Sequence, residues 1–148
     1  MVCMANICRS PMARAVAQQL ADQAGQANQW TFDAAGTHAP GVGVKPDPRA
    51  KAVLAQRGYA LANTRSRRVT AQDFERFDLL LAMDDSNLAA LQHQCPTAQH
   101  HKLHLLLSFA PDSGAHEVPD PYFGSLAGFE RVLDLCEAGV RGLLKHPF

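Results

Sequence analysis

Apolar residues recur at helical spacing in several stretches of this 148-residue chain. Two further stretches begin with the polar residues that start helices, Thr70–Asp73 and Asp84–Asn87. The longer helices are predicted at about Ser10–Ala24, Asp47–Gly58 and Ser125–Leu144, with Asp47 as N-cap of the second and glycines at the ends of the first two.

Three other stretches have the patterns of strands. Gln29–Ala34 alternates between apolar and polar residues, whereas Phe77–Met83 and Lys102–Leu107 are short and nearly all apolar, as in strands covered on both faces. A further strand should lead into Cys3, but only Met1 and Val2 precede it, so we expect this first strand to be truncated.

Strands and helices thus alternate along the chain. This order predicts a single α/β domain over residues 1–148, with a parallel sheet of about four strands and helices on both faces, as in flavodoxin-like and Rossmann-like folds. Ligands of such folds bind at the carboxyl ends of the strands.

The composition argues against several classes of function, namely nucleic-acid binding, membrane association and metal binding. Lys plus Arg and Asp plus Glu both number 14, so no net charge favours nucleic acid or an anionic membrane. No apolar run approaches the roughly 20 residues that span a bilayer. The four cysteines have neither zinc-site nor disulfide-framework spacing, and the seven histidines are scattered. We therefore expect a cytoplasmic protein without metal or cofactor.

Residues 3–11, Cys-Met-Ala-Asn-Ile-Cys-Arg-Ser-Pro, have the features of a phosphate-binding loop. Backbone N–H groups of such a loop and of the following helix can surround an oxyanion, and Arg9 can bind two phosphate oxygens. These donors would favour the thiolate form of Cys3, a candidate nucleophile, although Cys3 could instead be a buried structural cysteine. The residues expected to line or support the loop are Met4, Ala5, Asn6, Ile7, Cys8 and Ser10.

A second candidate group lies near the C-terminus, where two prolines flank Asp120. This carboxyl could protonate a leaving oxygen and then activate water, although an Asp between prolines is usually a turn residue. Tyr122 could flank the substrate pocket or lie in the core. Pro40 belongs to a Gly- and Pro-rich loop, residues 36–48, which could be a pocket rim or a plain connector.

The loop closely resembles the signature loop of the low-molecular-weight protein tyrosine phosphatases, and the chain resembles a bacterial-type member of that family. The residues that carry the resemblance are Cys3, Asn6, Cys8, Arg9, Ser10 and Pro11. Further segments resemble the family in the same order: Ala35–Thr37, Pro46–Ala50, Asp73–Asp78 and Leu81–Asn87. The resemblance implies hydrolysis of phosphotyrosine in proteins through a phosphocysteine on Cys3, with Asp120 as general acid and base.

The resemblance also implies further roles. Asn6 would brace the loop by hydrogen bonds, and Tyr122 would stack on the substrate ring. Cys8 would be either a small core residue or a redox partner that traps an oxidised Cys3 as a disulfide. The implied partners are a phosphotyrosine protein and a bacterial tyrosine kinase, with the enzyme a monomer or weak dimer.

Three departures from the family pattern leave alternatives open. Ala5 replaces a usual Gly and would strain the loop if that position needs a positive φ or has no room for a methyl group. Pro40 and Ala34 replace an aromatic residue and a Ser, so the phosphotyrosine ring would be held less well. With the short first strand, Ala5 favours a rival function, a phosphate-binding or regulatory module with weak catalysis.

Two enzymatic rivals share the scaffold. Protein-arginine phosphatases resemble this chain but have a small polar Thr where Ile7 stands, and Ile7 should favour a phenyl ring over a guanidinium. Arsenate reductases need additional cysteines near Met83, where this chain has none.

Overall fold

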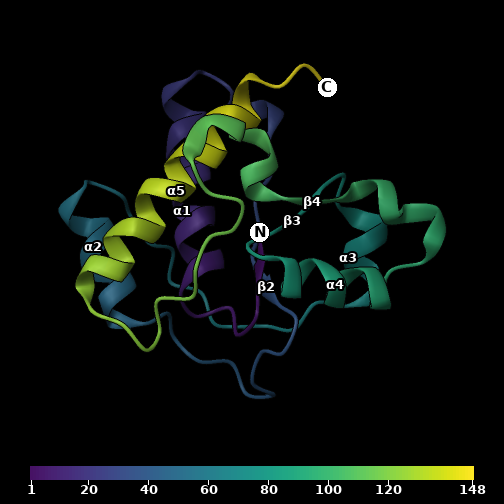
Figure 1. The fold of residues 1–148 in the computed structure, drawn as a ribbon, viewed down its shortest axis with the longest axis horizontal. Coiled ribbons are helices and arrows are strands. Elements are labelled where there is room, and N and C mark those ends of the chain that lie inside the picture. Colours follow the sequence, from purple (N-terminus) through teal and green to yellow (C-terminus); the bar gives the residue numbers. More distant parts are fainter.

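The computed structural model describes residues 1–148 and has one parallel sheet of four strands (Figure 1). The strands follow one another in the order β2-β1-β3-β4, which is the flavodoxin-like order. They are short: β1 Val2–Cys3, β2 Ala35–Gly36, β3 Leu80–Ala82 and β4 Leu103–Leu105.

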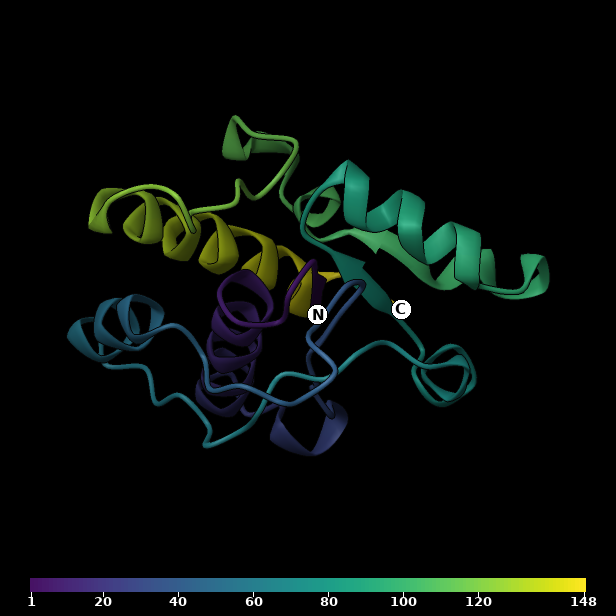
Figure 2. The same ribbon diagram turned by 90° about the horizontal axis from the view of Figure 1, so that it is seen from below.

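Helices cover both faces of the sheet, as predicted. Helices α1 (Arg9–Gln23), α2 (Pro48–Gln56) and α5 (Leu126–Lys145) pack together over one face, and α3 (Ala71–Arg76) and α4 (Asp85–Gln94) lie on the other side (Figures 1 and 2). Side chains along the strands alternate between the two cores. Those facing the core beneath α1, α2 and α5 are Cys3, Leu81 and Met83, and those facing the core beneath α3 and α4 are Val2, Leu80 and Ala82.

The helix starts lie where the capping residues predict them. Asp47 is the N-cap of α2 and accepts a hydrogen bond from the Arg49 backbone N–H at 2.8 Å. The pairs Thr70–Asp73 and Asp84–Asn87 both form reciprocal capping boxes, at α3 and α4. These signals are reliable because the groups that satisfy each other are at most three residues apart.

The prediction of a strand at Gln29–Ala34 is wrong. Residues Ala27–Gln29 form a 3₁₀ turn, and residues 30–34 have no partner in the sheet. β1 pairs Val2 with Ala35 and Cys3 with Gly36, so in this register residues 30–34 lie beyond the first residue of β1. A parallel ladder needs two strands side by side, so the alternating stretch lies outside the sheet.

The other two predicted strands exist but are shorter than expected. Lys102 ends a 3₁₀ segment, Thr97–Lys102, and Leu106–Phe109 forms another directly after β4. A third, Pro111–Ser113, lies in the predicted loop before Asp120. No helix combines the length and apolar character required to cross a membrane.

Candidate active site

Residues 4–8 form a loop that leaves the carboxyl end of β1 and enters α1. β1 lies between β2 and β3, so the chain leaves neighbouring strands toward opposite sides at this point. This is the topological switch point where open α/β sheets bind their ligands. The free N–H groups and positive dipole end of the 15-residue helix α1 face the same place.

Asn6 holds the loop in shape. It is the one non-glycine residue with a positive φ, 59°, a conformation that asparagine tolerates better than most residues. Its side-chain Nδ2 donates to Ser10 Oγ at 2.7 Å, and its side-chain Oδ1 accepts from the Arg67 backbone N–H at 3.0 Å. The loop is thereby tied both to α1 and to a segment about 60 residues away.

The backbone geometry of the loop also bears on the expected strain at Ala5. The left-handed backbone falls on Asn6 and not on Ala5, so the expected strain from a positive φ at Ala5 is absent.

Cys3 lies at the base of the loop, with 3% of its surface exposed. Its Sγ is 3.1 Å from Ser10 Oγ and accepts from the Asn6 N–H at 3.3 Å. These two contacts hold the Cys3 sulfur at the base of the loop.

Arg9 is buried at the first position of α1 and is held by two other parts of the chain. Its Nη1 donates to Asp84 Oδ2 at 2.6 Å and to the Val118 carbonyl at 3.0 Å. Asp84 uses its other oxygen to cap α4, at 2.7 Å from the Asn87 N–H. The sequence identified Asp84 as a helix cap only; nothing local indicates its second role as the counter-charge of Arg9.

The structure brings Asp120 to this loop across 111 residues of chain. Asp120 Oδ2 lies 3.9 Å from Arg9 Nη2, and the Asp120 side chain is 41% exposed. The Tyr122 side chain is exposed as well, which excludes the alternative of a core tyrosine. Both side chains are therefore accessible to solvent.

Gly36 was not singled out as a site residue, yet it permits the loop to lie where it does. A Cβ at Gly36 would be 2.6 Å from the Met4 carbonyl oxygen and 3.0 Å from the Asn6 nitrogen. After Gly36 the chain continues beside the loop, with the Thr37 and His38 N–H groups donating to the Cys3 and Met4 carbonyls at 2.9 and 2.8 Å. Pro40 follows in this segment and is exposed.

Arg67 and Arg68 both bind neighbouring segments of the chain. Arg67 pairs with Asp73 at 2.9 Å and with Asp33 at 3.1 Å. The Arg68 guanidinium donates to the Ala39 carbonyl at 2.8 Å and ties down the loop that carries Pro40.

Cys8 is a buried free thiol, 3.9 Å from Asp47 Oδ2. Burial, together with the negative charge of Asp47, raises the pKa of Cys8 to about 12. Cys8 is therefore protonated at neutral pH and packs as a small core residue; its role as redox partner of Cys3 stays a prediction.

A cavity of about 960 Å³ lies at the other end of the strands, between residues 26–35 and 76–81. None of Cys3, Arg9 and Asp120 lines it. No group of three or more His, Cys, Asp or Glu side chains is placed to hold a metal ion.

Comparisons with known proteins identify the family of this chain. The family model described as low molecular weight phosphotyrosine protein phosphatase matches residues 1–146. A low molecular weight protein-tyrosine-phosphatase of Streptomyces coelicolor is 42% identical over 146 residues, which cover 97% of this chain and 88% of the relative.

Two solved structures are also similar. A protein tyrosine phosphatase from Entamoeba histolytica, with Hepes in its active site, superposes with a TM-score of 0.93 at 36% identity, covering 97% of this chain and 91% of that one. The arginine phosphatase YwlE of Bacillus subtilis, as a cysteine-to-serine mutant with a phosphorylated active-site serine, gives 0.85 at 30% identity, with 97% and 91% coverage. With its fold, its phosphate loop and a family match over nearly its whole length, the chain belongs to the low molecular weight phosphotyrosine protein phosphatase family.

Proposed function

We propose that this phosphatase hydrolyses phosphotyrosine in proteins through a phosphocysteine intermediate on Cys3, with Asp120 as general acid and base. The observation that carries the proposal is that Asp120 meets the loop of Cys3 and Arg9, although it is more than 100 residues away along the chain. The buried Cys3 sulfur contacts Ser10 Oγ and the Asn6 N–H, Arg9 lies at the first position of α1 directly after the loop, and Asp120 Oδ2 lies 3.9 Å from Arg9 Nη2.

In the first step the Cys3 thiolate attacks phosphorus on the side opposite the phenolic oxygen. The S–P bond forms, the P–O bond breaks, and Asp120 gives its proton to the departing oxygen. Arg9 and the loop N–H groups stabilise the equatorial oxygens. In the second step water attacks phosphorus, Asp120 takes its proton, and the S–P bond breaks to release phosphate and the thiolate.

Fixed charges support this assignment. Arg9 is held by the Asp84 carboxylate and the Val118 carbonyl before any substrate binds, so its guanidinium needs no reorganisation during the reaction. The Asp120 side chain is exposed enough for the attacking water of the second step to reach it.

The arginine phosphatase YwlE gives a second candidate activity a specific basis, because the two chains are similar at 30% identity. We favour phosphotyrosine because Ile7 presents an aliphatic side chain rather than a small polar one at the loop. Comparing kcat/KM for a phosphotyrosine peptide with kcat/KM for a phosphoarginine peptide decides between them: a higher value for phosphoarginine overturns the preference.

The central test is Cys3→Ser. This variant should not turn over phosphotyrosine peptide, and it should still bind inorganic phosphate because the loop donors remain. Cys95→Ser, at a buried cysteine outside the site, is the matched control and should keep full turnover. Retained turnover in Cys3→Ser contradicts the phosphocysteine mechanism, and phosphate binding without turnover in the unmodified protein favours the phosphate-binding module.

As partner we propose a tyrosine-phosphorylated protein in the cytoplasm, with a bacterial tyrosine kinase as the specific expectation. Monomer or weak dimer is the expected state.

A further inference from the structure

The segment that carries Asp120 has few attachments to the rest of the molecule. Residues 119–125 are exposed except for Pro121, and their internal contacts are local: the Gly124 N–H donates to the Pro121 carbonyl at 3.0 Å, and the Tyr122 N–H to Asp120 Oδ1 at 3.1 Å. The position of the Asp120 carboxyl therefore depends on contacts with other parts of the chain.

Arg49 supplies the hydrogen bonds that reach this segment from another part of the chain. Its Nη2 donates to the Tyr122 carbonyl at 2.9 Å and its Nη1 to the Gly124 carbonyl at 3.3 Å. The guanidinium carbon also lies 4.6 Å from the ring centre of the buried Phe129, in the first turns of α5.

The Arg49 side chain is itself held in place. Its Nε and Nη2 donate to the two oxygens of Asp47, at 3.1 and 2.9 Å, and Asp47 is fixed as the N-cap of α2. Nε, Nη1 and Nη2 together make four polar contacts, a fork geometry that the single ammonium of lysine cannot reproduce.

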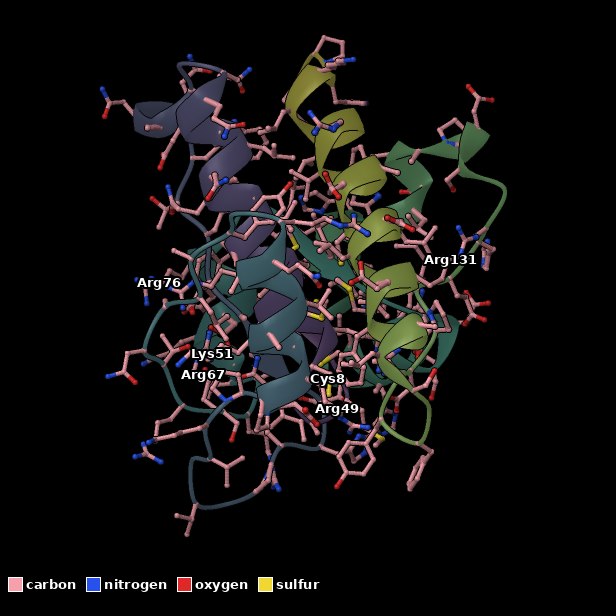
Figure 3. The ribbon with its side chains drawn as sticks, turned by 90° about the vertical axis from the view of Figure 1, so that its left-hand side faces the viewer. Cys8, Arg49, Lys51, Arg67, Arg76 and Arg131 are labelled. Carbon is pink, nitrogen blue, oxygen red and sulfur yellow. The ribbon has the colours of Figure 1, made fainter.

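The same pair touches the phosphate loop. The Asp47 N–H donates to the Ile7 carbonyl at 2.8 Å, and Asp47 Oδ2 is 3.9 Å from Cys8 Sγ. Figure 3 shows Arg49 beside Cys8, at the end of α2 that faces the start of α5. Asp47 and Arg49 thus connect the loop of the nucleophile to the segment of the acid.

We propose that Arg49 is a positioning residue that holds Asp120 at the distance from Cys3 required to protonate the leaving group. The inference rests on the proposed function. Arg49 acts through the Tyr122 and Gly124 carbonyls and does not touch the substrate. A carboxyl displaced by about 1 Å loses much of its effect, because proton transfer requires hydrogen-bond distance.

The test uses two substrates that differ in their need for an acid. Phosphotyrosine peptide has a leaving group with a pKa of about 10, whereas 2,4-dinitrophenyl phosphate releases a strongly acidic phenol that needs little protonation. kcat/KM reports only the steps up to departure of the leaving group. Arg49→Met should lower kcat/KM about 10- to 100-fold on the peptide and less than about threefold on the dinitrophenyl ester.

Three variants accompany it. Asp120→Asn is the reference for loss of the acid and should show the same substrate dependence more strongly. Arg49→Lys keeps the charge and should recover only part of the activity. Arg57→Met is the matched control: Arg57 also connects α2 to α5, through Glu130, Asp134 and Glu137, but from the opposite end of α2 to Arg49. It should keep kcat/KM on both substrates.

The outcomes are distinct. If Asp120→Asn shows no substrate dependence, the assigned acid is wrong, and the proposed function fails together with the inference. If Asp120→Asn shows it but both Arg49 variants lose activity equally on the two substrates, only the inference is overturned. The inference is also overturned if the Arg49 variants lose inhibition by inorganic phosphate to the same extent as they lose activity, because Arg49 would then act on the phosphate loop. If Arg49→Met melts below the assay temperature, Arg49→Lys gives the decision.

Discussion

At the scale of single residues, the site depends on a few positions where the backbone has little room. Asn6 adopts the left-handed conformation, and its side chain makes two hydrogen bonds, to Ser10 and to the Arg67 backbone. Gly36 lets the neighbouring strand approach the loop so closely that a methyl group would meet the Met4 carbonyl at 2.6 Å. The loop therefore keeps its shape without ligand, which lowers the entropic cost of phosphate binding.

Gly36→Ala tests this close approach. The added methyl must displace the loop backbone, so we expect a loss of about 1–3 kcal/mol in the free energy of unfolding and weaker inhibition by inorganic phosphate. Urea denaturation and inhibition kinetics measure the two effects. Gly41→Ala is the control, because a Cβ there meets nothing within 4 Å and the residue has no positive φ. Equal behaviour of the two variants contradicts the explanation.

At the scale of elements, the site lies at helix starts, and each start also contributes to the active site. The N-cap Asp84 neutralises Arg9, and the N-cap Asp47 orients Arg49. A carboxylate at a helix N-terminus is stabilised by the free N–H groups there, so the same residue can cap a helix and pair with a guanidinium.

The cap of α2 makes a prediction about pH. Hydrogen bonds from the Arg49 side chain lower the pKa of Asp47 below its ordinary value of 3.8. A carboxyl with a lowered pKa stabilises the folded state fully above its unfolded pKa, and this stabilisation is lost as pH falls through the folded value. Asp47→Asn keeps a capping side chain but cannot ionise. We expect it to be less stable than the unmodified protein at pH 7 and to lose less stability between pH 7 and pH 3.

Urea denaturation at the two pH values measures this difference. Parallel losses of stability in the unmodified protein and in Asp47→Asn would show that the Asp47–Arg49 pair contributes nothing to acid sensitivity.

At the scale of the whole molecule, the C-terminal helix α5 packs against several other elements. It packs on α1, α2 and the 3₁₀ segment Leu106–Phe109, and its first turn follows directly on the acid segment (Figure 2). Near its other end the helix backbone nearly touches the chain beneath it, since a Cβ at Gly142 would be 1.8 Å from the Phe109 carbonyl oxygen.

Two Gly→Ala changes in α5 should therefore differ in their effect on stability. Alanine favours a helix over glycine by up to about 1 kcal/mol. Gly142→Ala must push α5 away from Phe109, and this overpacking outweighs the helix gain, so we expect a loss of about 2 kcal/mol or more. Gly128→Ala places its methyl 3.7 Å from Pro121, an ordinary contact, and should be neutral or stabilising by about 0.5 kcal/mol. Thermal denaturation of both variants measures the signs, and a stabilised Gly142→Ala would contradict the packing.

The sequence by itself determined what depends on neighbouring residues. The loop after Cys3 that leads into a helix, the capping residues Asp47, Thr70 and Asp84, and the alternation of strands and helices are all local patterns, and the structure confirms each of them. The placement of Asp120 beside this loop was expected from its type and setting and from the family resemblance.

Only the tertiary structure decided the lengths of the strands and the partners of the site residues. Residues 30–34 alternate like a strand but lie outside the sheet, because a ladder requires a second strand beside it. The pairing of Arg9 with Asp84, the close approach at Gly36 and the contact of Arg49 with the acid segment join residues that are 30 to 75 positions apart. No local periodicity records such contacts, because they arise where separate elements pack against one another.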